Sequence, residues 1–306
     1  AWHTEEVRVR NWERPGPHSA QEPWGFLPDE WGPPPPRQPE QAASMDDVKA
    51  IFDGYDVGIR YADDAVGVLL NELADLGVLD DTAVLVSSDH GEAFGELGVY
   101  ADHQGADEAT CHIPAILRWP ALEPGVDEGL HYHLDIGATV VDLAGLEVPG
   151  HWDGRSVRAD LEAGRPTGRD QLILSQGAWT AQRGVRWGDQ LYLRTWHDGF
   201  HGWPDEMCFD VSADPHEQVD LAPDRPDLVV EGRGRLEAWT DEALGRSLPL
   251  PGADEPVDPL TIVLDEGGPY HVRGRLPDYL ERLRATGRGR WADELAARYP
   301  TDGAGG

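Results

Sequence analysis

The longest periodic stretch of the chain is a run of apolar residues at three- and four-residue steps, which predicts an amphipathic helix. Ser44 and Asp47 have the spacing of a capping box, so the helix is expected to begin at Ser44. Gly77 is expected to end it, because glycine readily adopts the left-handed conformation that follows a helix. The residues that recur at these steps are Val48, Ile51, Phe52, Tyr55, Ile59, Ala62, Val66, Leu69, Leu70 and Leu73.

Two short apolar runs after this helix predict strands. Residues 83–87 (AVLVS) and 113–119 (IPAILRW) are continuously apolar, as strands buried on both faces of a parallel sheet are. A short helix is predicted next, capped by Asp135, passing through Leu143 and ended by Gly145. The order helix, strand, loop, strand, helix indicates an α/β fold.

After about residue 165 the pattern changes to short strand candidates separated by Gly, Asp and Pro turns, which predicts a small antiparallel sheet. The strand candidates are residues 172–174, 184–187, 191–194 and 208–211. A helix over 227–244 is expected to pack on this sheet, and residues 246–275 are expected to be a loop. Residues 276–299 are expected to be helical, with a break near 287–289 where two glycines occur.

These patterns divide the chain into three predicted parts. Residues 1–43 are an irregular covering segment rich in Pro and Trp, in which the prolines at 33–36 exclude helix and central strand. Residues 44–160 form the α/β core, and residues 161–306 form a small α+β subdomain and tail.

The composition and charge of the chain exclude several classes of function. The 306 residues include 25 Lys+Arg and 57 Asp+Glu, for a formal net charge of −32, which disfavours partners such as nucleic acid or an anionic membrane surface. The apolar runs are far shorter than the ~20 residues of a membrane span, and Cys111 and Cys208 are too few for a disulfide scaffold. Lys49 is the one lysine, which suggests a cytoplasmic protein of a halophile; an acidic protein from a GC-rich mesophile is the alternative.

The sharpest chemical feature is the sequence Ser-Ser-Asp-His-Gly-Glu at 87–92, directly after a predicted strand. Ligand groups gather at the carboxyl ends of strands in open α/β sheets, which favours a functional role for Asp89 and His90. A carboxylate oxygen beside an imidazole nitrogen suits a divalent metal ion. A second Asp-His pair ends at His103 and could complete a polar pocket. The alternatives are a solvated turn for the first pair and a surface loop for His103.

Other candidates are weaker. His131 and His133 could chelate a metal but are interpreted as surface residues, and Gly199 between His197 and His201 disfavours a helical zinc pair. A nucleophilic Cys111 assisted by its neighbour His112 is disfavoured, because adjacent residues in a strand point to opposite faces. The tryptophans of the first segment are interpreted as packing residues; they are Trp2, Trp12, Trp24 and Trp31.

Four segments, in this order, resemble the sulfatases of the alkaline-phosphatase superfamily over about residues 45–222. They are DDTAVLVSSDHGEAFGE, CHIPAILRWPAL, HYHLDIGATVVDLAGLEVPGHWDGRSV and CFDVSADPHEQVDLA. The resemblance implies part of a mostly parallel sheet with flanking helices, plus a small antiparallel sheet with a packed helix. It also makes residues 44–160 the C-terminal half of the sulfatase core.

The resemblance implies hydrolysis of a small-molecule or carbohydrate sulfate ester. Asp89 and His90 would be metal ligands, with Ca²⁺ the expected ion and Mg²⁺ or Mn²⁺ the alternatives. The family nucleophile is a formylglycine made from Cys or Ser in a C/S-x-P-x-R motif. The family often has Lys or His before the R-W-P strand, where His103 or His112 would contact the leaving group or the anion. The oligomeric state is left open.

Neither cysteine lies in a C-x-P-x-R motif, since Cys111 precedes His-Ile-Pro and Cys208 precedes Phe-Asp. We therefore expect the nucleophile and the first metal carboxylates upstream of Ala1, and a chain that is inactive alone. A phosphonate monoester or phosphodiester hydrolase of the same superfamily stays open, because His90 stands where many sulfatases have Asn. A non-catalytic remnant is the third reading.

Overall fold

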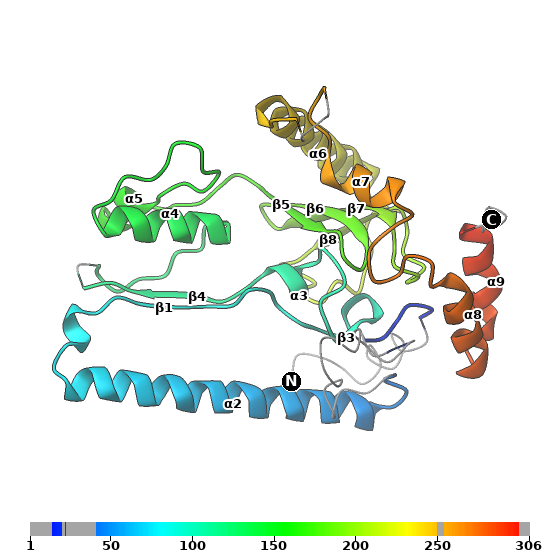
Figure 1. Ribbon diagram of the computed structural model, residues 1–306, viewed down its shortest axis with the longest axis horizontal. Helices are drawn as coiled ribbons and strands as arrows, with labels where there is room; N and C mark the ends of the chain where they lie inside the picture. The colour runs from blue at the N-terminus through cyan, green and yellow to red at the C-terminus, as the bar shows by residue number, and fades with distance from the viewer. Residues whose placement is uncertain (1–13, 20–21, 23–40, 121, 250–253, 300–306) are drawn as a thin grey trace.

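A 31-residue helix, α2 (Met45–Asp75), forms one long side of the molecule (Figure 1). The computed structural model describes residues 14–19, 22, 41–120, 122–249 and 254–299. The side chain of Ser44 accepts a hydrogen bond from Asp47 N at 3.1 Å, and Gly77 after the helix has φ +70°. The predicted ends of the helix are therefore confirmed.

The apolar face of α2 is buried only near the beginning of the helix. Val48 and Ile51 pack against Phe94 and Tyr100, but most apolar residues of the later turns are exposed. The helix contacts β2 (Ala93–Phe94) and β3 (Tyr100–Asp102) near its beginning and the 3₁₀ turn η2 (Leu79–Asp81) near its end. Periodicity marks the face that would be buried but does not provide a partner to bury it.

The two predicted core strands are β1 (Val84–Ser87) and β4 (Ala115–Arg118), and they pair antiparallel, with Leu85 opposite Leu117. The expected mostly parallel sheet is wrong for the described residues, in which every pair of named strands is antiparallel. A continuous apolar run indicates a strand suited to burial on both faces, but it carries no information on the direction of the neighbouring strand.

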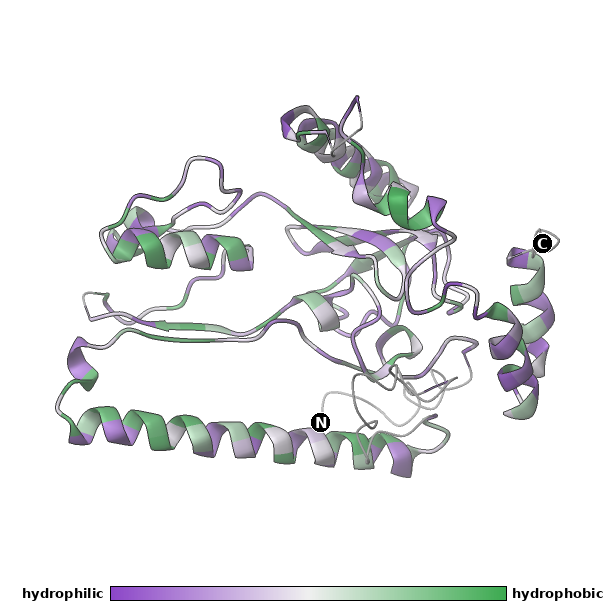
Figure 2. Ribbon diagram, in the orientation of Figure 1, coloured by the Kyte–Doolittle hydropathy of each residue, from purple (hydrophilic) through white to green (hydrophobic). Residues whose placement is uncertain are grey.

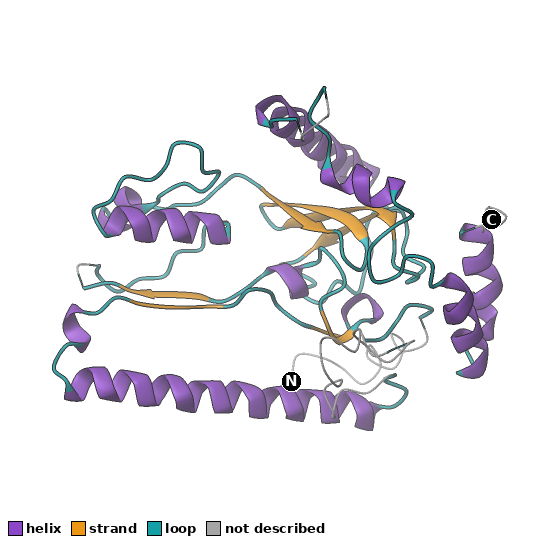
Figure 3. Cartoon of the chain, viewed as in Figure 1, coloured by secondary structure: helices purple, strands orange, loops and turns teal. Residues whose placement is uncertain are grey.

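The predicted small antiparallel sheet is confirmed (Figure 3). Its four strands follow one another in chain order: β5 (Leu172–Gln176), β6 (Ala181–Trp187), β7 (Gln190–His197) and β8 (Glu206–Asp210). Helix α6 (Pro226–Arg246) packs on the sheet through Leu228 and Leu236. Gly232 allows the close approach, because a Cβ there would lie 2.4 Å from the ring of Tyr192.

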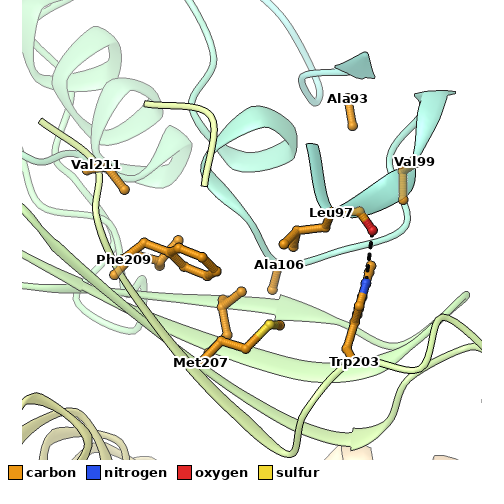
Figure 4. Close-up of a cluster of buried hydrophobic side chains, with 10 residues drawn as sticks. Ala93, Leu97, Val99, Ala106, Trp203, Met207, Phe209 and Val211 are labelled. Carbon is orange, nitrogen blue, oxygen red and sulfur yellow. Dashed lines mark hydrogen bonds between the residues drawn. The ribbon is translucent and has the colours of Figure 1, made fainter. Parts of the chain in front are cut away.

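A second buried cluster joins this sheet to the segment that follows β1 (Figure 4). Leu97, Val99 and Ala106 pack against Met207 and Phe209. The segment also contains β2, β3 and the short helix α3 (Glu108–Cys111). The cluster fixes this loop-rich segment on the C-terminal sheet.

Helix α4 (His133–Leu143) matches the predicted short helix, and Gly145 follows it with φ +75°. Asp135 lies in the first turn instead of at the cap, where its carboxylate accepts a hydrogen bond from Tyr132 N at 2.9 Å. Helix α5 (Arg158–Glu162) follows.

The tail contains three helices: α7 (Pro259–Asp265), α8 (Leu276–Ala285) and α9 (Gly289–Arg298). The predicted break is confirmed at Gly287, with φ +79°. The predicted loop over 246–275 is wrong at α7. The proline in the first turn of this helix follows the N-cap Asp258, a position that favours proline, but the prolines nearby made the whole segment resemble a loop. None of the helices in the described ranges combines the length and apolarity needed to cross a bilayer.

The four N-terminal tryptophans lie outside the described residues, and the three-part division of the chain stays a prediction.

A buried ion pair ties the beginning of the described chain to the tail. Glu22 is fully buried, and its carboxylate contacts Arg288 and lies 3.4 Å from Arg282 Nε. The same carboxylate accepts a hydrogen bond from His18 N at 3.0 Å.

We predict that Glu22→Ala lowers the free energy of unfolding by about 3–5 kcal/mol, because it leaves the buried Arg288 without its counter-charge. Glu242→Ala is the matched control, since Glu242 pairs with Arg246 at an exposed site and is expected to cost less than about 1 kcal/mol. Urea unfolding at constant salt measures both variants. Equal losses for the two would contradict the importance of the buried pair.

Candidate functional site

The turn after β1 is held by its own hydrogen bonds. The Ser88 hydroxyl donates to His90 O at 2.6 Å, and Asp89 Oδ1 accepts from His90 N at 3.0 Å. The Nδ1–H of His90 donates to Gly91 O at 2.8 Å, since a carbonyl can only accept. This fixes the tautomer and leaves the lone pair of His90 Nε2 available for a ligand.

Gly91 brings this turn against α3. Its N–H donates to Thr110 O at 2.7 Å, and a Cβ at this position would lie 2.1 Å from Ala109 O. Glycine is therefore required for the close backbone approach. The contact joins the Asp89–His90 turn to the segment that bears His103.

His103 follows β3 and is held in position by a network of buried polar side chains. Its N–H donates to Asp102 Oδ1 at 2.8 Å, and Asp102 Oδ2 accepts from Gln104 Nε2 at 2.9 Å. Gln104 Oε1 in turn accepts from His201 Nε2 at 2.8 Å. His201 is therefore part of this network and not of a zinc pair with His197, whose ring stacks on Tyr299.

The structure brings the three residues singled out from the sequence together. The rings of His90 and His103 lie 3.8 Å apart between centroids, and Asp89 Oδ2 lies 3.7 Å from His90 Nε2. Glu92 joins them, with a carboxylate oxygen 3.8 Å from His103 Nδ1, an ion-pair distance too long for a hydrogen bond. One donor atom each from His90, Glu92 and His103 lies within 4.8 Å of the other two.

Glu92 was missed as a functional candidate, although it stands two residues after His90 in the same motif. Its carboxylate oxygen Oε1 is buried and makes no hydrogen bond, and the same is true of His103 Nδ1. Unpaired buried polar atoms are costly, so their presence at one place is consistent with a bound group there.

The charges of the site are set by local contacts. Backbone N–H groups of Asp89 and His90 lower the pKa of the Asp89 carboxyl, which is fully exposed and ionised at neutral pH. The Glu92 carboxylate raises the pKa of His103 against the opposing effect of burial, and Asp102 adds to the rise. His103 thus gains positive character in an otherwise acidic site.

The C-terminal subdomain also contributes to this region. Gln176 at the end of β5 donates from Nε2 to His103 O at 2.9 Å. Beyond it, Trp179 stacks on His271 with ring centroids 4.4 Å apart, and His271 N donates to Ala178 O. Burial lowers the pKa of His271, and the nearby charge of His103 lowers it further.

Several other candidates are not part of the cluster. His112 is exposed and pairs with Glu108 at 3.2 Å. His131 pairs with Asp127 at 3.0 Å, and His133 Nε2 lies 3.5 Å from Ser87 Oγ. Burial raises the pKa of the Cys111 thiol, which opposes formation of a nucleophilic thiolate.

Behind α3 lies a pair of buried carboxyls. Asp107 Oδ1 caps this helix by accepting from Thr110 N at 2.7 Å, and Glu217 Oε1 accepts from Glu108 N at 2.7 Å. Burial raises the pKa of Asp107 to about 6, and burial together with Asp107 raises that of Glu217 well above its ordinary value. Asp107 and Glu217 therefore stay protonated to a higher pH than exposed carboxyls do.

Comparison with known proteins shows which family this chain resembles. Residues 15–146 match the sequence description of the family named Sulfatase. Choline-sulfatase of Rhizobium meliloti is 30% identical over 175 residues, 55% of this chain and 32% of the relative. N-acetylglucosamine-6-O-sulfatase of Bacteroides thetaiotaomicron is 34% identical over 170 residues, 52% of this chain and 30% of the relative. The chain thus spans about a third of the length of these relatives.

Solved structures support the same fold. The phosphonate monoester hydrolase of Silicibacter pomeroyi superposes with a TM-score of 0.55 at 21% identity, over 80% of this chain and 49% of that one. The superposition shows a shared fold, in which Asp89 and His90 closely follow the apolar strand β1. The match over residues 15–146 and the two relatives make this chain similar to the sulfatases, a family of the alkaline-phosphatase superfamily.

We predict that Asp107 makes stability depend on pH. The unfolded carboxyl ionises near pH 3.9, whereas the folded one has a pKa of about 6. The native state therefore binds more protons between these values, and the free energy of unfolding falls as pH rises through them. Asp107→Asn keeps an oxygen that can cap α3 but cannot ionise.

The stability of Asp107→Asn relative to the wild type should accordingly rise by about 1–3 kcal/mol between about pH 4 and pH 8. Urea unfolding across this range measures the difference between the two proteins. Glu217 adds to this difference in the same direction, because loss of the Asp107 charge lowers the pKa of Glu217. A difference that does not change with pH would contradict a buried carboxyl with a raised pKa.

Proposed function

We propose that this chain provides the metal-binding and leaving-group side of a sulfuric ester hydrolase. The observation that carries the proposal is that Asp89 and His90, which closely follow the apolar strand β1, lie beside His103. Similarity to the sulfatase family supports the reaction class.

The donor atoms fit a divalent cation. Asp89 offers an exposed, ionised carboxylate, and His90 offers a Nε2 lone pair because its Nδ1–H is engaged by Gly91 O. Hard oxygen suits Ca²⁺ and Mg²⁺, whereas a mixed oxygen and nitrogen set also suits Mn²⁺. A bound cation would neutralise the charge of the ester oxygens.

His103 is suited to a role toward the leaving group or the sulfate oxygens. Its raised pKa keeps the imidazole protonated closer to neutral pH, and the contacts of Asp102 and Gln176 with its backbone hold it in place. A positioned imidazolium can donate a proton to a departing alkoxide or a hydrogen bond to an anion. Glu92 is proposed as the residue that maintains this charge.

The substrate is proposed to be a small-molecule or carbohydrate sulfate ester. This rests on the names of the relatives, a choline-sulfatase and an N-acetylglucosamine-6-O-sulfatase. A phosphonate ester is the second candidate, supported by the superposition on a phosphonate monoester hydrolase and by His90 beside Asp89.

The nucleophile is proposed to come from outside the 306 residues. The sequence contains no C-x-P-x-R or S-x-P-x-R motif from which the family's formylglycine could be made. Cys111 does not replace it, because burial and three neighbouring carboxylates raise the pKa of its thiol. The cofactor set thus consists of a divalent ion held partly here and a formylglycine supplied elsewhere.

We predict that the purified chain hydrolyses p-nitrophenyl sulfate and a p-nitrophenyl phosphonate ester no faster than buffer, in low and in molar salt, with Ca²⁺, Mg²⁺ or Mn²⁺. Without an attacking oxygen, bound substrate has no reaction path to accelerate. Chelator-sensitive turnover by the chain alone would contradict the assignment of the nucleophile.

A complementation assay tests the residues themselves. When the polypeptide encoded in frame upstream of Ala1 is supplied, activity should appear and should fall at least about 100-fold in Asp89→Ala. Asp81→Ala is the matched control, because Asp81 is an exposed carboxylate at the other end of β1. Full activity in Asp89→Ala would refute the metal-ligand assignment, and the preferred ester would decide between the two substrates.

A further inference from the structure

The long helix α2 is apolar on two sides yet largely uncovered. Ile59 and Leu69, on the same side as the buried Val48, are 55% and 65% exposed. Val57, Tyr61 and Val68 recur at four- and seven-residue steps on the opposite side, and Tyr61 is 80% exposed. A helix with apolar residues on opposite sides is ordinarily buried between two layers. Figure 2 shows the apolar positions along the helix.

The antiparallel ribbon of β1 and β4 has the same property. Leu85 and Val86 are adjacent in β1 and therefore point to opposite faces, and both are exposed. Ile116 in β4 is 63% exposed. Within the described ranges, β1 pairs only with β4, so each strand has one unpaired edge. An isolated two-stranded ribbon is marginal in water, and a free apolar edge favours the addition of another strand.

The helix and the ribbon are neighbours in the chain. They extend together along the molecule and are joined at their far end through η2 (Figure 1). Arg118 at the end of β4 fixes this junction by donating to Leu79 O at 2.5 Å and to Thr82 O at 2.8 Å. We call the exposed apolar residues of these two elements the α2–ribbon face, which includes both sides of α2, and define it by Ile59, Tyr61, Leu69, Leu85 and Ile116.

Charge and fold together indicate what covers this face. A second copy of the chain would bring another net charge of −32 to the contact, which opposes self-association. The structural neighbour that covers 80% of this chain has only 49% of its own length matched. About half of that related fold therefore has no counterpart here, and it is a source of further strands and apolar surface.

We propose that the α2–ribbon face is a docking surface for a polypeptide that carries the remaining strands of the same α/β fold. This polypeptide adds a strand at a free edge of the β1–β4 ribbon and covers both apolar sides of α2. The proposal concerns association and stands independently of whether the assembled site hydrolyses a sulfate ester.

The test is a binding measurement on the full 306-residue chain, with the polypeptide encoded in frame immediately upstream of Ala1 as the probe. Hydrogen exchange should be fast in residues 57–69 of the chain alone and slow in β6 and β7. Addition of the probe should slow exchange in residues 57–69 and 84–87 and leave α6 unchanged.

Variants locate the contact. Leu69→Asp and Ile116→Asp should each weaken binding of the probe at least about 30-fold, since a charge at a buried apolar contact is poorly tolerated. Both residues are exposed in the chain, so its own fold should be retained. Val230→Asp is the control, because Val230 is 66% exposed on α6, in a different part of the molecule.

Four outcomes would overturn the proposal. They are slow exchange of residues 57–69 in the chain alone, a dimer of the chain that Leu69→Asp dissociates, absence of binding by the probe, and a stop codon or unrelated sequence upstream of Ala1. None of these measurements uses catalytic turnover, so they separate failure of the docking surface from failure of the proposed function.

Discussion

The candidate site depends on the packing of the segment after β1 against the four-stranded antiparallel sheet. Leu97 and Val99 in that segment lie in one buried cluster with Met207 and Phe209 of the sheet. Trp203 donates from its indole nitrogen to Leu97 O at 3.0 Å, which fixes the turn between β2 and β3 (Figure 4). His103 follows β3 directly, so this packing sets its position.

The segment reaches this position at a conformational cost. Leu97 and Ala101 have φ values of 50° and 51°, a region that residues with a Cβ rarely adopt. Such backbone strain persists only where the surroundings impose it, and it is common near functional groups. Here the imposing contacts are the apolar cluster and the hydrogen bonds of Asp102, Gln104 and His201.

Local signals in the sequence predicted the local structure well. Ser44 and Gly77 marked the ends of α2, and the runs at 83–87 and 113–119 marked β1 and β4, because caps, turns and strand length are determined by neighbouring residues. The pair Asp89 and His90 could be found because it follows an apolar strand directly.

Properties that depend on distant partners could not be predicted in this way. The antiparallel direction of β1 and β4 and the exposure of α2 follow from which segments meet in space. Glu92 becomes a candidate only once His103, eleven positions later in the chain, is seen beside it. Helix α7 was hidden because Pro and Gly dominate the residues around it.

Asp89 and His90 are proposed to hold a divalent ion next to His103. The most direct measurement is an anomalous diffraction map of the chain, assembled with the polypeptide encoded upstream of Ala1 and soaked with Mn²⁺. A peak is expected about 2.0–2.3 Å from an Asp89 carboxylate oxygen and from His90 Nε2, with His103 in the adjoining space. An assembled, ordered site with no peak there, or a peak held by other residues, would contradict it.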